Sequence, residues 1–206
     1  LDRSNLHTFI FDEKEIEGFV ITVSDEKYAL CDKTSIGDNY WANSKKGAYG
    51  KGLGRTKSDP YKPVRTGLLG QMAVGELLGL PTDLKYREKG DKYDFLLGKY
   101  KVDVKCAMRD YGKGLIYHTN QWGKQIPLDK DIYIFSFVQE EDRHAQTAKV
   151  AVVGFASQKD VLKCPVKPGI KGNGHLNIEV NFSTLRPIQA LIRLNMLIGF
   201  TEKVAV

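Results

Sequence analysis

The chain has 206 residues, a mass of 23.2 kDa and a formal net charge of +6 at pH 7. This length fits one domain, and no apolar run approaches the roughly 20 residues that a membrane-spanning helix needs. The first residues lack the basic-then-apolar order of a secretory signal, and three widely spaced cysteines without a CxxC pair argue against a zinc site. We therefore expect a globular, cytoplasmic protein with reduced thiols.

Positive charge is concentrated in one stretch of the chain. Between residues 44 and 66, seven Lys or Arg side chains stand against one acid, so this segment alone carries +6. The first 32 residues have the opposite charge balance, with eight acidic side chains against three cations. A concentrated basic segment suits a polyanionic partner, although a solvated loop would have the same composition.

Residues 1–64 are expected to form an N-terminal extension. Short apolar runs at 9–11 and 18–23 are typical of peripheral strands. Residues 44–64 combine glycines with lysines, which predicts a basic, glycine-rich loop. Whether this extension is a separate recognition unit or forms one compact domain with residues 65–206 stays open at the level of sequence.

A helix is expected from about residue 65 to residue 80, because apolar side chains recur there on one side and Pro81 should end it. Gly98 and Lys99 suit the tight turn of a hairpin, and Pro187 and Gly199 suit the two ends of a late helix. The strands are predicted at 92–97, 100–107, 131–138 and 149–156, and the late helix at 186–199. This order describes an α/β layer with a small mixed sheet.

The strand predicted at 100–107 divides its side chains between two faces. Val102 and Val104 should face the core, whereas Asp103 and Lys105 share the other face, about 7 Å apart along the backbone. An acid two residues before a lysine also occurs elsewhere in the chain. Here, however, the partner strand of the hairpin carries an acid as well, Asp94.

Asp94 and Glu76 are the further carboxylates of the candidate site. Strand propensity disfavours an aspartate at position 94, and the helical spacing puts Glu76 on the same side as Leu69 and Met72. A carboxylate on a core-facing stripe is unfavourable unless a cation or hydrogen bonds receive it. The simpler interpretation of Asp94 is a strand-entry residue or a surface salt bridge with a neighbouring lysine. That of Glu76 is a boundary position, with its side chain bent to solvent.

These residues resemble the motif of the PD-(D/E)XK nuclease superfamily, which includes restriction enzymes, Holliday-junction resolvases, recombination nucleases and some homing endonucleases. The resemblance rests on Gly75 and Glu76 in a helix, then Asp94, then the run Asp103-Val104-Lys105. It covers about residues 65–156. It implies a restriction-endonuclease-like core, with a small mixed β-sheet flanked by helices in the order αβββαβ and the N-terminal strands at its periphery.

The resemblance also implies the chemistry of the site. Asp94 and Asp103 would ligate Mg²⁺, and Glu76 would complete the metal site. Lys105 would position the attacking water. Carboxylate oxygens suit Mg²⁺, for which Mn²⁺ is expected to substitute. One departure is Tyr93, which stands where the motif has proline.

Two basic segments are candidates for holding nucleic acid. One is the glycine-rich loop with the start of the helix that follows it, and the other comes directly after Lys105. Glycines let backbone amides approach phosphates, and the interleaved aromatic rings could stack on bases. The alternative for the second segment is a plain surface loop. The candidate contacts are Lys45, Lys46, Lys51, Arg55, Lys57, Lys62, Arg65, Lys113, Gln121 and Lys124.

The sequence therefore predicts a Mg²⁺-dependent endonuclease that hydrolyses phosphodiester bonds in DNA with site or structure selectivity. Restriction, homing, phage and junction-resolving enzymes all fit this prediction. A homodimer or higher homo-oligomer would supply two sites for cutting both strands. The alternatives are a non-catalytic DNA- or RNA-binding protein with a vestigial nuclease core, and an assembly protein whose basic loop meets an acidic partner.

Overall fold

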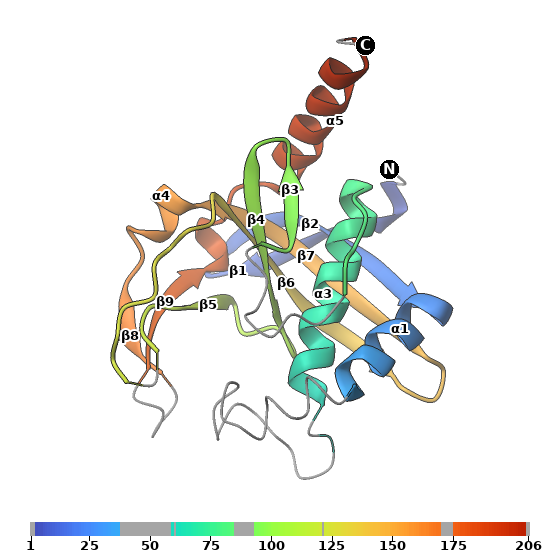
Figure 1. The fold of residues 1–206 in the computed structure, drawn as a ribbon, viewed down its shortest axis with the longest axis horizontal. Helices are drawn as coiled ribbons and strands as arrows, with labels where there is room; N and C mark the ends of the chain where they lie inside the picture. The colour runs from blue at the N-terminus through green and yellow to red at the C-terminus, as the bar shows by residue number, and fades with distance from the viewer. Residues whose placement is uncertain are drawn as a thin grey trace.

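The computed structural model describes residues 3–37, 59, 61–84, 93–120, 122–169 and 175–204. Within these residues the chain is an α/β protein, with a mixed six-stranded sheet, a smaller three-stranded sheet and four α-helices (Figure 1). The α/β class predicted from the spacing of apolar residues is confirmed.

The six-stranded sheet has the order β1-β2-β7-β6-β4-β3. Neighbouring strands are antiparallel except β4 and β6, which are parallel. The two N-terminal strands are therefore not detached from the sheet, since β2 pairs with β7 over six residues. The bounds are β1 (Leu6–Phe11), β2 (Lys14–Ser24), β3 (Phe95–Leu97), β4 (Tyr100–Ala107), β6 (Ile132–Asp142) and β7 (Thr147–Ser157).

The three-stranded sheet has the order β5-β9-β8 and is antiparallel throughout. Its strands are β5 (Lys113–Tyr117), β8 (Val166–Pro168) and β9 (Leu176–Asn181), none of which the apolar spacing predicted. Strand β5 lies in the connection from β4 to β6, and the described residues of this connection contain no helix. The predicted αβββαβ order is thus wrong: five strands separate α3 from α4 in the described chain.

The described helices are α1 (Asp25–Ile36), α3 (Lys62–Leu78), α4 (Gln158–Val161) and α5 (Ile188–Val204), with short 3₁₀ turns at Arg3–Asn5 and Phe182–Thr184. Helix α3 ends before Pro81, because Gly79 adopts a left-handed conformation (φ 66°) and Leu80 N–H donates to the carbonyl of Gly75. Gly199 does not end α5, which continues to Val204.

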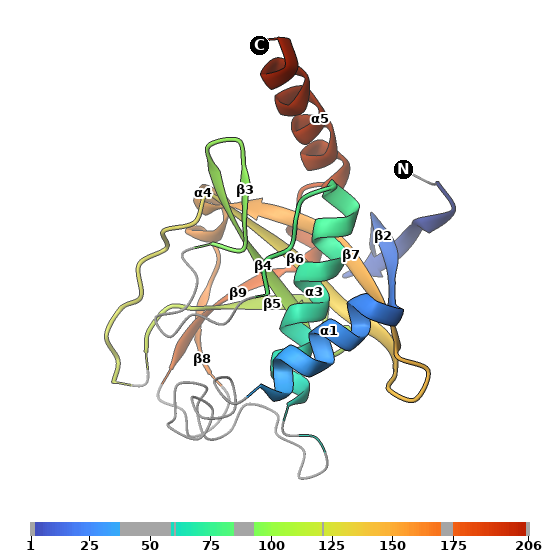
Figure 2. The same ribbon diagram turned by 45° about the vertical axis from the view of Figure 1, so that its right-hand side comes forward.

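The six-stranded sheet is covered on both faces. One face packs against α1 and α3, which lie side by side (Figures 1 and 2), and this layer includes Val102, Val104, Leu69 and Val23. The opposite face packs a second apolar cluster that contains residues of the small sheet, among them Ile178 and Val180. The alternation of side chains along the strands produces this division, apart from two register shifts in the β6–β7 pairing.

Helix α5 begins against the core and then projects from the body (Figure 1). Ile188 and Leu191 are buried, whereas Met196 and Leu197 are exposed.

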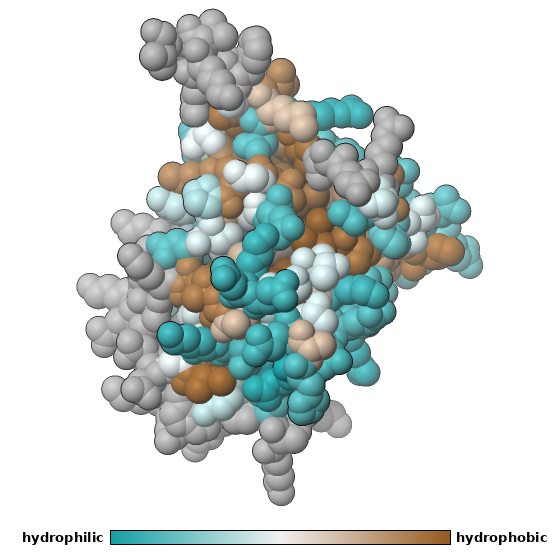
Figure 3. All heavy atoms as spheres, turned by 90° about the vertical axis from the view of Figure 1, so that its right-hand side faces the viewer, coloured by the Kyte–Doolittle hydropathy of each residue, from teal (hydrophilic) through white to brown (hydrophobic). Residues whose placement is uncertain are grey.

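On the face seen in Figure 3, polar side chains cover most of the lower half and apolar atoms show in the upper half. No helix of the described chain is both long and apolar enough to cross a bilayer.

Candidate active site

Asp103 and Lys105 lie together on β4, as the alternation of side chains predicts. Nζ of Lys105 is 2.6 Å from Oδ2 of Asp103. This oxygen is buried and makes no hydrogen bond with the described residues, so the ammonium group compensates it as an ion pair. Val102 and Val104 are buried on the opposite face, in the layer under α3.

Asp94 joins the pair immediately before β3 begins at Phe95. Its backbone N–H donates to the carbonyl of Val102 at 2.9 Å, so Asp94 lies beside β4. The backbone N–H of Val104 donates to Oδ2 of Asp94 at 2.6 Å, which holds the carboxylate against β4.

The helix residue at this site is Gln71, which sequence reasoning missed. Its Nε2 donates to Oδ1 of Asp94 at 2.8 Å. Both carboxylate oxygens of Asp94 therefore accept hydrogen bonds, one from α3 and one from β4. A polar residue within the otherwise apolar run 68–74 was the available signal.

Glu76 does not face the core, and that prediction is wrong. Its carboxylate is exposed and pairs with Nζ of Lys27 on α1 at 2.6 Å. In the described part of the chain no three His, Cys, Asp or Glu side chains gather closely enough to hold a metal ion. The site therefore brings together two carboxylates, Asp94 and Asp103, with one ammonium and one carboxamide.

The charges around Lys105 decide its protonation. Burial alone would lower the pKa of Lys105, but the carboxylates of Asp103 and then Asp94 outweigh it, so the pKa lies above its ordinary value. Tyr117 on β5 acts in the same direction. Burial, and then the carboxylate of Asp103, also raise the pKa of Tyr133, which pairs with Asp103 across β4 and β6. Lys105 is thus a cation at neutral pH.

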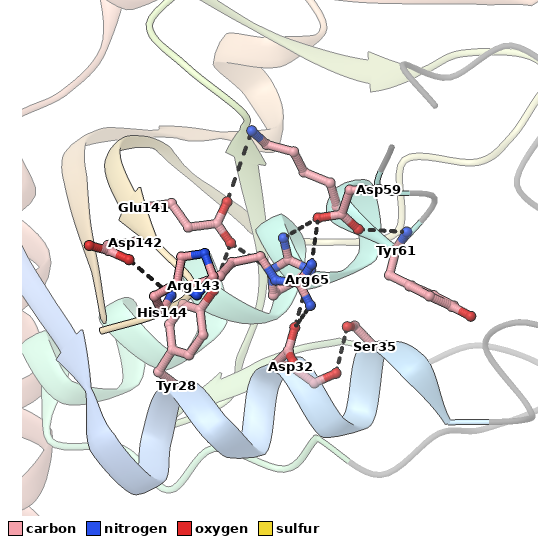
Figure 4. A network of polar contacts seen from close by, with 11 residues as sticks. Tyr28, Asp32, Ser35, Asp59, Tyr61, Arg65, Glu141, Asp142, Arg143 and His144 are labelled. Carbon is pink, nitrogen blue, oxygen red and sulfur yellow. Dashed lines mark hydrogen bonds and ion pairs between the residues drawn. The ribbon is translucent and has the colours of Figure 1, made fainter. Parts of the chain in front are cut away.

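Arg65, a predicted nucleic-acid contact, is instead buried, with 1% of its surface exposed. Its guanidinium donates to Glu141 at 2.6 Å, to Asp59 at 2.5 Å and to Asp32 at 3.2 Å (Figure 4). Lys62, also a predicted contact, lies 3.9 Å from the other oxygen of Glu141. The guanidinium of Arg65 is buried and paired with three carboxylates, so it cannot reach a phosphate in this structure.

The remaining predicted contacts divide into two groups. Lys113 pairs with Glu179 at 2.8 Å, and Lys124 lies in the turn whose amides donate to Oδ1 of Asn120. Lys167 also pairs with Glu179, so these three side chains together carry a net charge of +1. Lys45, Lys46, Lys51, Arg55, Lys57 and Gln121 lie outside the described residues.

Three exposed aromatic side chains lie in the segment that follows Lys105. Tyr111, Tyr117 and Trp122 are 48%, 42% and 80% exposed. The guanidinium of Arg109 lies 4.9 Å from the ring centroid of Tyr111. Exposed rings beside cations are able to stack on nucleic-acid bases, and the sequence had already singled out this segment.

Comparison with protein-family models, with curated proteins and with solved structures found no match for this chain.

Proposed function

We propose that the chain is a metal-dependent endonuclease that hydrolyses phosphodiester bonds in DNA on a restriction-endonuclease-like core. The observation that carries the proposal is the meeting of Asp94, Asp103 and Lys105 where β3 begins beside β4. A hairpin followed by a parallel strand, with α3 over one face, supports the restriction-endonuclease-like core. Two departures from it are the added strand β5 and, among the described residues, five strands in succession between α3 and α4.

Two carboxylates are compatible with Mg²⁺, which proteins usually hold through one or two carboxylates together with waters and substrate phosphate. The buried Oδ2 of Asp103, which makes no hydrogen bond with described residues, is a suitable hard ligand, and Asp94 would be the second. When bound, the metal would activate water and neutralise charge on the phosphate. Glu76 is not part of this revised ligand set.

Lys105 would act through its charge and its N–H groups. Because its pKa is raised, its ammonium group donates hydrogen bonds and cannot accept a proton at neutral pH. Placed beside Asp103, it would orient the attacking water or stabilise the negative charge that develops on the phosphate. Tyr111, Tyr117 and Trp122 would contact the bases or sugars of the polynucleotide on either side of the scissile bond.

Incubation with supercoiled plasmid, branched DNA and RNA, in Mg²⁺ or in EDTA, tests the activity. We expect nicking of DNA with Mg²⁺ or Mn²⁺ and none in EDTA. Asp103→Asn should abolish cleavage, and Lys105→Met should abolish cleavage while DNA binding is retained. Lys101→Met is the matched control, since this exposed lysine lies on the same strand, and it should cut like the wild type.

The second candidate is a DNA- or RNA-binding protein without catalysis. The 2.6 Å ion pair between Lys105 and Asp103 favours it, because that pair already compensates the buried carboxylate without any metal. Binding that weakens steeply with salt, with no cleavage of any substrate in Mg²⁺ or Mn²⁺, would support this candidate and refute the nuclease.

A further inference from the structure

Helix α3 meets the candidate site through Gln71 and not through an acid. Nε2 of Gln71 donates to Oδ1 of Asp94, and the N–H of Val104 donates to Oδ2. An ionised carboxylate only accepts hydrogen bonds, so the amide group that faces it must be the NH₂, and the carbonyl of Gln71 points away. The two donors, on different elements, fix the plane of the Asp94 carboxylate.

The position of Gln71 is itself tightly set by two glycines of α3. A Cβ at Gly70 would lie 2.4 Å from Cβ of Cys106 on β4. A Cβ at Gly75 would lie 2.2 Å from Oγ1 of Thr82, in the segment that follows the helix. Neither position accommodates a larger residue without movement, and the contact at Gly70 shows that α3 lies close to β4 there. Gln71, next to Gly70, is thereby held over the start of β3.

We infer that Gln71 is a positioning residue that orients Asp94 toward the cation site without neutralising it. A lysine or arginine at this position would cancel the charge that a metal ligand needs, and a carboxylate would repel Asp94 in the absence of metal. The carboxamide does neither. It leaves Asp94 and Asp103 as two negative charges against the one ammonium of Lys105, so the site keeps a net charge of −1 for a cation.

This inference rests on the proposed function, and its test uses Mn²⁺ alone as the probe. The wild-type chain and its Gln71→Met and Gln71→Glu variants would be titrated with Mn²⁺ by calorimetry. The unfolding midpoint of each protein would also be measured with and without Mn²⁺. Methionine keeps the length of the side chain and removes the donor. Glu76→Gln is the control, because Glu76 lies on the same helix and faces Lys27 on α1 instead of the site.

Gln71→Met should weaken Mn²⁺ binding by roughly 10–100-fold, the usual effect of losing a residue that orients a metal ligand. Gln71→Glu should lower the metal-free midpoint, and Mn²⁺ should raise its midpoint by more than it raises that of the wild type, because the added carboxylate then meets a cation. Glu76→Gln should bind Mn²⁺ like the wild type.

Two results would overturn the inference in distinguishable ways. In the first, the wild type binds Mn²⁺, Asp103→Asn does not, and Gln71→Met binds Mn²⁺ as tightly as the wild type. Gln71 would then only support the start of β3, and the proposed nuclease would stand. If the wild type neither binds Mn²⁺ nor cuts DNA, the proposed function fails and the inference fails with it.

Discussion

The buried guanidinium of Arg65 is held by carboxylates from three separate parts of the chain. Asp32 comes from α1, Asp59 precedes α3, and Glu141 lies near the end of β6. The hydroxyl of Tyr28 also donates to Glu141 at 3.0 Å (Figure 4). Burial tends to lower the pKa of Arg65 and to raise that of Asp59, but their mutual contact reverses both shifts. The group remains fully ionised because each charge has a partner.

Removing this guanidinium should strongly destabilise the fold. We expect Arg65→Met to lower the free energy of unfolding by about 3–5 kcal/mol, because three partly buried carboxylates lose their shared cation. Urea denaturation measures the change. Arg143→Met is the matched control: Arg143 approaches Asp32 and Asp59 at 3.3 and 3.7 Å but is half exposed, so its loss should cost about 0–1 kcal/mol. Equal effects of the two substitutions would contradict this account.

Short elements here depend on caps that tie them to distant segments. Helix α4 has four residues and begins with a capping box between Ser157 and Asp160. Asp160 also accepts two hydrogen bonds from Arg186, at 2.8 and 3.1 Å, just before α5 begins. One carboxylate therefore fixes the start of α4 and the entry to α5. The hydrogen bonds from Arg186 and Ser157 hold the pKa of Asp160 well below its usual value.

This lowered pKa makes the contribution of Asp160 depend on pH. A carboxylate with a depressed folded-state pKa stabilises the fold above its unfolded pKa of about 3.9, and that stabilisation is lost as the pH falls toward the folded value. Asp160→Asn should therefore cost about 1 kcal/mol at pH 7 and progressively less below about pH 4. Urea unfolding of both proteins across this range measures the difference, and a difference that stays constant down to about pH 3 would contradict it.

At the scale of the whole molecule, the N-terminal strands and the elements that follow residue 64 share one sheet and one apolar layer. Phe19, Ile21 and Val23 on β2 belong to the same buried cluster as Leu69 of α3 and Val102 of β4. Six residue pairs join β2 to β7. A division near residue 64 would cut through this layer and would leave β7 as an unpaired edge.

A fragment of residues 59–206 should consequently fail to fold independently. It lacks β1, β2 and α1, and with them Asp32, one of the partners of Arg65. We expect aggregation, or a broad unfolding transition without cooperativity, when its denaturation is followed by circular dichroism. The full chain is the control and should unfold in one transition. A soluble, monomeric fragment with a sharp transition would support an independent core instead.

The sequence by itself determined the features that depend on neighbouring residues. The alternation along 100–107 correctly placed Val102 and Val104 in the core and Asp103 beside Lys105, and Gly98 correctly marked the turn of the hairpin. Local periodicity and turn chemistry are sufficient for such predictions, because side-chain direction in a strand follows from the backbone alone.

Only the tertiary structure decided which helix residue meets the site and which cations are exposed. Gln71 and Glu76 are about 140° apart around the axis of α3, and both border its apolar side, so spacing could not choose between them. The close contact of Gly70 with β4 fixed the rotation of the helix. Arg65 resembles its basic neighbours in sequence, yet a carboxylate 76 positions away, on Glu141, holds it in the interior. Contacts over such separations depend on how the elements pack, which no local pattern records.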